Sequence, residues 1–378
     1  MARSICRTLI VLSLNNTAIL HKPPISNSIS VLLFSSSSPK KSKPAIPVVD
    51  YLTKQHQFSP EAASEAALSI PYINNPEKSD SILSFLKENG FSKSHIDEIL
   101  KKGPYVLCSK LNETIKPKLK ILQDLGFSQN EIADILAANP WIFTRSLDCR
   151  LAPSISVLRS VLGPSADVCK ALKVSAWYLK YDLEKTMMPN IEFLQSCGVS
   201  SQQIIGSVYT FPRLLLHKPE NLRDFVKRVD EMGVSRKSKM YFYAVRTLSS
   251  MNREKWENKL KLFRNLGFSG DQVLSLFRRA PHAFAVSETK IKEVCEMFLA
   301  RKNLDASFIF EHPELLIHSV KGRLEPRFAV FEILERKNLL RRKPKLTTLL
   351  KISQQQFMAR YVLPYSNELG DVSMLLRT

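Results

Sequence analysis

Apolar residues recur in pairs along this chain with the spacing of helices. Pairs such as Phe85-Leu86 and Ile121-Leu122 lie five and four residues before a glycine. A second kind of pair, such as Ile99-Leu100, lies nine and ten residues after the glycine. Because apolar pairs at these offsets line one face of a helix, the pattern predicts an amphipathic helix on either side of each glycine.

The glycines between the predicted helices recur at a nearly constant interval, which indicates an internal repeat. They are Gly90, Gly126, Gly163, Gly198, Gly233 and Gly267, and their successive intervals are 36, 37, 35, 35 and 34 residues. Asn303 and Asn338 continue the series at intervals of 36 and 35 residues. Asparagine, like glycine, tolerates the left-handed conformation that ends many helices. The sequence therefore predicts eight units of about 35 residues.

Two residues beyond each glycine, the sequence offers an N-cap for the second helix. The candidates are Ser92, Ser128, Ser165, Ser200, Ser235 and Ser269, with Asp305 in the seventh unit. Glu131, Gln203 and Gln272 stand three residues after their serines, which predicts three capping boxes. Phe91 before the cap and Ile96 at the fourth helical position predict a hydrophobic staple, and three further units repeat this pair.

Prolines mark the ends of the predicted helices. Pro104, Pro140, Pro212 and Pro281 each follow a glycine by fourteen residues. Proline cannot continue a helix, so we expect the second helix to end there and a short linker to follow. A further series, expected at the first position of the next unit's first helix, comprises Pro117, Pro153, Pro189 and Pro326. Unit three has Trp177 in place of the helix-ending proline, and unit five has Thr247.

Units of this size bury their apolar faces only by stacking on their neighbours. The predicted fold class is therefore all-α, a right- or left-handed superhelical solenoid of about eight helical repeats. We assign the repeat array to residues 80–362, a helical lead-in to residues 46–79 and a C-terminal tail to residues 363–378.

The first 49 residues differ in composition from the rest of the chain. They contain six Lys and Arg, ten serines and no acidic residue. This composition is typical of an organelle transit peptide, and we interpret residues 1–45 as a segment removed after import. A mitochondrial destination is favoured, with the chloroplast as the alternative. No apolar run approaches the ~18 residues that a membrane span needs, so no membrane partner is expected.

Positive charge is concentrated in the C-terminal half of the chain. The formal net charge is +20, and residues 225–361 hold 28 basic and 14 acidic residues. Such an excess attracts polyanions and releases counterions when it binds phosphates, although a basic surface can also serve solubility alone. The candidate nucleic-acid-binding residues are Arg213, Arg246, Arg253, Lys255, Lys259, Arg264, Arg278, Arg279, Arg323, Arg327, Arg336, Arg341 and Arg342.

Aromatic residues near this charge are candidates either for stacking on bases or for the core. They are Tyr241, Phe242, Tyr243 and Trp256. At helical spacing the core is the favoured place for most of them. Tyr241 and Tyr243 cannot both face inward together with Phe242, so we expect one of the two tyrosines to be exposed.

Catalytic and metal-binding motifs are absent from the sequence. It has no phosphate loop, no Gly-x-Gly-x-x-Gly, no His-Glu-x-x-His and no Gly-x-Ser-x-Gly. The six cysteines are too far apart for a zinc site or a disulfide framework. We therefore expect no enzyme activity, no metal and no cofactor.

The repeated unit Phe-Leu-x-x-x-Gly-Phe-Ser followed by Ile-Leu-x-x-x-Pro, as in residues 85–104, resembles the mitochondrial transcription termination factor (mTERF) family, in particular its plant organellar members. The resemblance implies a superhelical all-α fold and a groove that binds nucleic acid. It also implies a role in organellar transcription, intron splicing or ribosome assembly. Tetratricopeptide and pentatricopeptide repeats have a similar length but lack the serine cap and the proline in this phase.

Two functions remain open at this stage. The first is a monomeric nucleic-acid-binding protein that regulates organelle gene expression, through transcription termination, intron splicing or RNA processing, with double-stranded DNA or structured RNA as its partner. The alternative is a helical-repeat scaffold that binds other proteins in the organelle. The two differ in their dependence on salt, because only phosphate binding releases many counterions.

Overall fold

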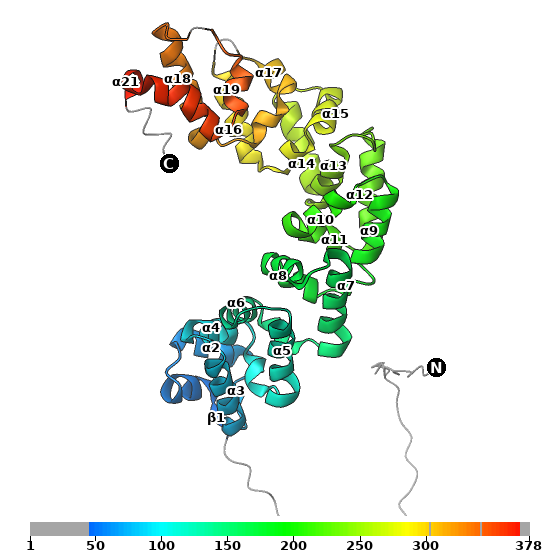
Figure 1. Ribbon diagram of the computed structural model, residues 1–378, viewed down its shortest axis with the longest axis vertical. Helices are drawn as coiled ribbons and strands as arrows, with labels where there is room; N and C mark the ends of the chain where they lie inside the picture. Colours follow the sequence, from blue (N-terminus) through cyan, green and yellow to red (C-terminus); the bar gives the residue numbers. More distant parts are fainter. Residues whose placement is uncertain (1–44, 302–303, 341, 371–378) are drawn as a thin grey trace, which may run out of the picture. The chain divides into compact units, whose positions relative to one another are not determined.

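Helices and turns follow the predicted repeat along the chain (Figure 1). The computed structural model describes residues 45–301, 304–340 and 342–370. The first helices of the eight units are α3 (Pro76–Glu88), α5 (Lys116–Asp124), α7 (Ala152–Leu162), α9 (Met187–Ser196), α12 (Pro219–Glu231), α14 (Arg253–Asn265), α16 (Glu288–Leu299) and α18 (Glu325–Arg336). The second helices of units one to seven are α4 (Lys93–Lys102), α6 (Gln129–Ala138), α8 (Ser165–Val174), α10 (Ser201–Thr210), α13 (Tyr241–Ser249), α15 (Gly270–Arg279) and α17 (Ala306–Glu311). The prediction of an all-α array of about eight helical repeats is confirmed.

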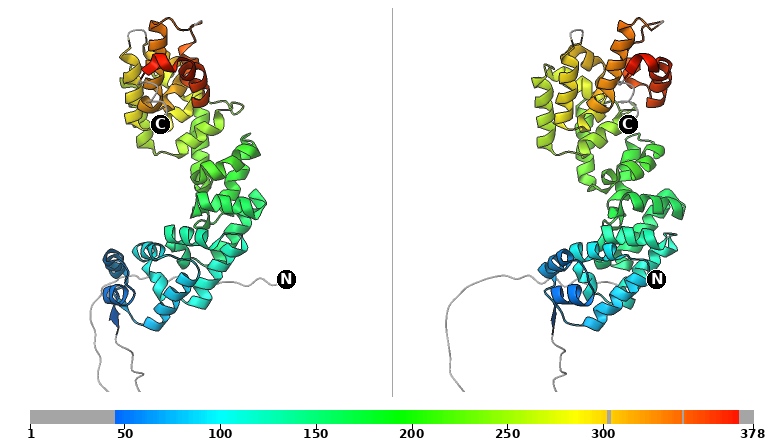
Figure 2. Two further views of the ribbon diagram at one scale, coloured as in Figure 1. Left: turned by 60° about the vertical axis from the view of Figure 1, so that its left-hand side comes forward. Right: turned by 90° about the vertical axis from the view of Figure 1, so that its left-hand side faces the viewer.

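Several neighbouring units pack on one another through their second helices. Helix α4 contacts α6, α8 contacts α10, and α13 contacts α15. Figures 1 and 2 show these neighbours side by side from different directions. The buried apolar residues form a continuous core that runs from Val48 to Leu369. Stacking therefore buries the apolar faces that a single unit would leave exposed.

The glycine at the end of each first helix has the conformation that the repeat predicts. All six repeat glycines have positive φ, between +74° at Gly233 and +100° at Gly126. Asn338 takes the same conformation with φ of +55°. Residues with a Cβ rarely adopt this region, which explains why glycine recurs here. Asn303 lies outside the described residues.

The three predicted capping boxes are confirmed, at Ser128, Ser200 and Ser269. Asp305 also caps its helix as predicted, by accepting hydrogen bonds from the backbone N–H groups of residues 307 and 308. Ser92 forms a fourth box that the sequence analysis missed, because its partner is the ring Nδ1 of His95 instead of a Glu or Gln side chain.

Two predicted caps are wrong. In unit three Pro164 occupies the N-cap position, and Ser165 is the first helical residue. In unit five Ser235 begins a turn, and α13 starts only at Tyr241. Lys239 replaces the apolar staple residue in unit five, so an earlier helical turn would have no side chain to bury.

The four helix-ending prolines are confirmed, but the linker that we expected after them is wrong. A short third helix takes its place in six units. These helices are Pro104–Cys108, Pro140–Thr144, Ala176–Leu179, α11 (Pro212–Leu216), Pro281–Ala285 and Pro313–Ile317, and all except α11 are 3₁₀ helices. Proline fits their first turn because its missing N–H would be unpaired there in any case.

The second series of prolines lies near the starts of the first helices, but later than the predicted first position. Pro117, Pro153 and Pro326 are each the second residue of their helix. Pro189 is instead the third residue of α9. Single π-helical turns lead into α5, α7 and α18, over residues Leu111–Ile115, Leu147–Leu151 and Val320–Leu324.

Additional elements pack on both ends of the array. Strands β1 (Ile46–Pro47) and β2 (Tyr72–Ile73) pair antiparallel around α1 (Val48–Asp50), the π-helical turn Tyr51–Gln55 and α2 (Pro60–Ser69). After α18 come α19 (Leu346–Lys351), α20 (Gln354–Phe357), the π-helical segment Met358–Val362, the 3₁₀ turn Leu363–Tyr365 and α21 (Ser366–Leu369). Helix α2 packs on α4, and α21 packs on α18.

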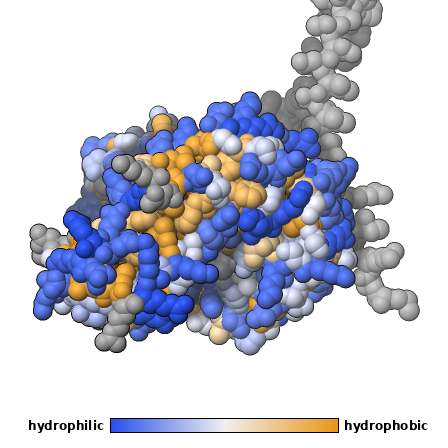
Figure 3. All heavy atoms as spheres, turned by 90° about the horizontal axis from the view of Figure 1, so that it is seen from above, coloured by the Kyte–Doolittle hydropathy of each residue, from blue (hydrophilic) through white to orange (hydrophobic). Residues whose placement is uncertain are grey.

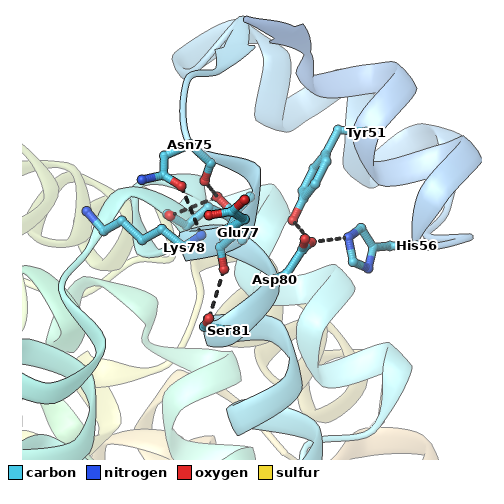
Figure 4. Close-up of polar contacts among 9 residues, drawn as sticks. Tyr51, His56, Asn75, Glu77, Lys78, Asp80 and Ser81 are labelled. Carbon is cyan, nitrogen blue, oxygen red and sulfur yellow. Dashed lines mark hydrogen bonds and ion pairs between the residues drawn. The ribbon is translucent and has the colours of Figure 1, made fainter. Parts of the chain in front are cut away.

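A polar contact joins the N-terminal elements to the first repeat (Figure 4). The Tyr51 hydroxyl donates to Oδ1 of Asp80 on α3 at 2.5 Å. The Nε2 atom of His56 lies 2.8 Å from the same oxygen. Burial, followed by the hydrogen bond to Asp80, raises the pKa of Tyr51, so this hydroxyl stays protonated and keeps donating. The segment before residue 80 is thus attached to the array by hydrogen bonds as well as by packing.

We expect Gly103→Ala to destabilise the protein by about 2 kcal/mol, because overpacking typically costs 1–3 kcal/mol. A Cβ at Gly103 would lie 2.7 Å from Cβ of Pro140 in the next unit. Gly270→Ala is the matched control, because nothing lies within 4 Å of its added Cβ and the residue is helical. Urea unfolding followed by circular dichroism measures both variants. Equal stability of the two would contradict the close approach of units one and two.

Candidate nucleic-acid interface

Many basic side chains of the array bind backbone carbonyl groups within their own unit. The last carbonyls of a short helix have no partner inside the helix, and a cation there also interacts favourably with the helix dipole. In seven units a polar side chain of the first helix donates hydrogen bonds to backbone carbonyls. These carbonyls lie at or just after the end of a later short helix of the same unit. These bonds join Lys78 to Cys108, Lys118 to Phe143, Ser154 to Tyr181, Asn190 to Leu215 and His217, Lys259 to Val286, Lys290 to Ile317, and Arg327 to Leu349, Leu350 and Ile352.

This arrangement corrects two of the predicted contact residues. Arg327 is fully buried, and its guanidinium donates to three carbonyl oxygens at 2.7–3.1 Å. Lys259 is 7% exposed, and its Nζ donates to the Val286 carbonyl. Burial lowers the pKa of both side chains. Neither group is placed to meet a phosphate, because each already serves as a cap inside the array.

Three further predicted residues share their donors with the backbone. Arg323 donates to the carbonyls of residues 350, 351 and 352 at 2.8–3.1 Å. Arg278 donates through Nε to the Met232 carbonyl at 2.7 Å, and Arg279 donates to the Phe310 carbonyl. Arg278 and Arg279 stay exposed, whereas Arg323 is half-buried. The hydrogen bonds of these arginines link neighbouring elements, so only their remaining N–H groups are available to a ligand.

The remaining basic candidates of the C-terminal units that the structure describes are exposed. Arg253, Lys255 and Arg264 are exposed along α14, and Arg253 lies 3.5 Å from the Asp224 carboxylate. Arg336 at the end of α18 and Arg342 beyond it are also exposed. Arg341 lies outside the described residues. Unlike Arg327 and Lys259, the described members of this group therefore remain accessible to a ligand.

The aromatic residues near this charge are mostly core residues. Tyr241, Phe242 and Trp256 are buried, and Tyr243 is 38% exposed. The prediction that one of the two tyrosines faces outward is confirmed. Trp256 packs against Phe277 and Phe284, so it is a core residue of unit six.

A row of alternating aromatic and basic side chains crosses units two to five, and we call it the cation–aromatic strip. It comprises Trp141, Lys180, Trp177, Arg213, Phe211 and Arg246. Nζ of Lys180 lies 5.9 Å from the ring centroid of Trp141 and 4.8 Å from that of Trp177. Cζ of Arg213 lies 5.5 Å from the Trp177 ring centroid on the other unit boundary. Cζ of Arg246 lies 3.7 Å from the Phe211 ring centroid.

The strip holds its charges without neutralising them. A ring attracts a cation through its quadrupole, so the cation keeps its full charge. Within the described part of the chain, no carboxylate forms an ion pair with Lys180, Arg213 or Arg246; the arginines that do pair with carboxylates are Arg150, Arg228, Arg236, Arg253 and Arg301. The strip is thus a set of positioned, uncompensated cations.

Two recesses border the strip, and Arg213 lines both. The first has a volume of about 550 Å³ and contains the carboxylates of Glu131 and Asp134. These are matched by Lys173, 2.5 Å from Glu131, and by His95, 3.1 Å from Asp134. The second recess has a volume of about 380 Å³ and lies between α11 and α13.

Arg213 and Arg246 were predicted from the sequence, whereas the strip residues Trp141, Trp177, Lys180 and Phe211 were not among the predicted contact residues. The prediction rested on positive charge, which is concentrated after residue 225, whereas the strip begins at Trp141. One usable signal was present, because Trp141 follows the helix-ending proline and Trp177 replaces it. Aromatic residues at this position of the repeat stand at the start of the third helix, where the side chain is only partly covered.

His318 gives the C-terminal units a dependence on pH. Burial, followed by the charges of Arg323, Arg327 and Lys290, lowers its pKa to about 4, and Glu314 opposes this shift. The unfolded chain binds a proton near pH 6.5 whereas the folded chain does not, so stability falls as the pH drops from about 6.5 to 4. We expect a loss on the order of 2 kcal/mol by pH 4.5.

His318→Asn removes this proton uptake and flattens the pH dependence in that window. Urea unfolding at pH 7.5, 6 and 4.5 compares the two proteins. Parallel curves for both would show that His318 does not contribute to acid sensitivity.

The described residues contain no group of three or more side chains that could hold a metal ion. None of the helices that the structure describes is both long and apolar enough to span a membrane.

Comparison with known proteins supports the interpretation of the repeat. No curated protein matches the chain. The family model described as mTERF matches residues 83–151 and 148–358, which is well over half of the sequence. This family consists of non-catalytic, organellar proteins that bind nucleic acid. Because the matched region covers the helical repeats together with the strip, the chain belongs to the mTERF family.

Proposed function

We propose that this protein binds structured RNA or double-stranded DNA in the mitochondrion along the cation–aromatic strip, and so regulates organelle gene expression. The supporting observation is the strip itself. Lys180, Arg213 and Arg246 are held on aromatic rings and lack carboxylate partners among the described residues. Positioned cations of this kind contact phosphates, which fixes a nucleic acid in place without reading its sequence.

The strip favours a partner with unpaired bases beside the phosphate contacts. Trp177 is 39% exposed, and Trp141 and Phe211 are partly exposed. Aromatic side chains at a surface stack on bases that have left a helix, and arginine planes do the same. Structured RNA offers such bases in loops and bulges, and DNA offers them where the duplex opens. Transcription termination, intron splicing and RNA processing all present nucleic acid in this form.

We expect the affinity for nucleic acid to fall about 10³-fold between 50 and 200 mM salt, because about six phosphate contacts release their counterions. The full chain is titrated into a fluorescent RNA stem-loop and into duplex DNA at each salt concentration. The arm with the higher affinity identifies the class of nucleic acid. A flat salt response or no binding in either arm would contradict the proposal.

The same experiment tests the protein-scaffold alternative, which one surface feature favours. Leu68 is 81% exposed, Tyr72 56% and Tyr105 53%. On a different face, the one seen from above, Figure 3 shows further exposed hydrophobic residues with hydrophilic residues along their margins. A scaffold that binds proteins through such surfaces gains affinity from apolar burial, which moderate salt does not weaken.

A further inference from the structure

The recess between α11 and α13 differs in its charge from the larger recess beside it. Its walls include Thr210, Phe211, Arg213, Leu214, His217, Arg246, Ser249 and Ser250, with Pro212. The lining contains two arginines and no carboxylate. The neighbouring, larger recess contains two carboxylates that are matched by basic partners. The lining of the smaller recess therefore carries more net positive charge than that of the larger one.

The two arginines are the charged donors of this recess. Arg246 is only partly exposed, and burial lowers its pKa, so its charge is held there against a cost in solvation. The hydroxyl groups of Thr210, Ser249 and Ser250 donate to backbone carbonyls of their own helices at 2.7–2.9 Å. Burial and the charge of Arg213 lower the pKa of His217, so its ring is neutral near pH 7. The net charge of the lining is therefore that of two guanidinium groups.

Two guanidinium groups match the charge and the oxygen atoms of a terminal phosphate better than those of an internal phosphodiester. A phosphate ester at the end of a nucleic acid carries a charge of about −1.5 to −2 at pH 7 and three free oxygens. A phosphodiester inside a strand carries one charge and two free oxygens. Each guanidinium donates in a planar fork that fits two phosphate oxygens. The terminal ester therefore uses both arginines, whereas an internal diester leaves one charge unmatched.

We infer that the recess between α11 and α13 binds a terminal phosphate of a nucleic acid through Arg213 and Arg246. This inference rests on the proposed function and adds a preference for strand ends to it. The ring centroid of Trp177 lies 5.5 Å from Cζ of Arg213, and that of Phe211 lies 3.7 Å from Cζ of Arg246. These contacts hold the two guanidinium groups in place in the absence of a ligand. Holding the donors in advance reduces the entropy lost on binding.

The test uses one RNA sequence in three forms, with a 5′-phosphate, with a 3′-phosphate and with two hydroxyl ends. Anisotropy titrations with the full chain are expected to show at least tenfold tighter binding of one phosphorylated form. Arg213→Gln combined with Arg246→Gln should abolish this preference. Lys180→Gln is the matched control, because Lys180 is a strip cation that does not line the recess. It should weaken all three forms equally and keep the preference.

The outcomes separate this inference from the proposed function. Equal binding of the three forms, or a preference that survives in the double variant, overturns the terminal-phosphate site and leaves the nucleic-acid function standing. If neither RNA nor duplex DNA binds, the proposed function fails. The recess is then tested by comparing the thermal shift that uridine 5′-monophosphate produces with the shift that uridine produces. A shift with the monophosphate alone, lost in the double variant, supports a site for free nucleotides. No shift overturns the inference.

Discussion

Replacing Lys180, Arg213 and Arg246 together with glutamine is expected to lower the affinity for nucleic acid about 100-fold. Three lost charge-assisted contacts at about 1 kcal/mol each give this factor. The slope of log affinity against log salt should also become shallower by about 2 to 3, because three fewer counterions are released. The measurement is the same salt titration of a fluorescent RNA stem-loop. All three side chains lie at the surface or are only partly buried, so folding should be preserved.

A second triple variant provides the control, with Lys255, Lys261 and Arg264 on α14 changed to glutamine. It removes the same formal charge from exposed positions away from the strip. We expect a loss of only a few-fold, because distant charges act through a screened field. If the α14 variant lost affinity and the strip variant kept it, the contact surface would lie on the first helices, and the proposed interface would be wrong.

Arg327→Met is expected to destabilise the C-terminal unit by about 3 kcal/mol. The buried guanidinium satisfies the carbonyls of Leu349, Leu350 and Ile352, and methionine leaves these acceptors without that partner. Each buried acceptor left unsatisfied costs about 1–3 kcal/mol. Arg323 still donates to the Leu350 and Ile352 carbonyls, so the expected loss of stability lies near the lower end of the sum over the three acceptors.

Arg336→Met on the same helix is the control for this variant. Arg336 is exposed, so its replacement should change stability by less than about 0.5 kcal/mol. Because a repeat array can unfold unit by unit, hydrogen exchange of the amides in α18 and α19 is the direct measurement. Equal protection in the two variants would show that Arg327 is not the cap of α19. A normal nucleic-acid affinity in Arg327→Met would fit its role inside the fold.

The repeat could be predicted from the sequence because its signals are local. A capping box joins residues three apart, and a staple joins residues five apart. The failures have local causes as well. Pro164 moved the cap in unit three, and Lys239 removed the staple in unit five, so each departure from the pattern coincided with a change in structure. The third helix was missed because five residues after a proline carry no periodicity that a pattern can reveal.

The candidate site was predicted only in part. Arg213 and Arg246 were named, and both lie in the strip. Arg327 and Lys259 were named for the same reason, their charge, and both are buried caps. The distinction depends on residues 22 to 27 positions further along the chain, whose carbonyls the two side chains reach.

The sequence by itself determined the unit, its glycine turn, most of its caps and the number of repeats, because each of these depends on residues within one or two helical turns. Only the tertiary structure decided which cations are available to a ligand. A Lys or Arg becomes a cap when the carbonyls at a helix end lie within its reach, as for Arg327, and it remains a surface charge when they do not, as for Lys180 and Arg213. That choice is made by the packing of elements distant in the chain, which composition and charge do not encode.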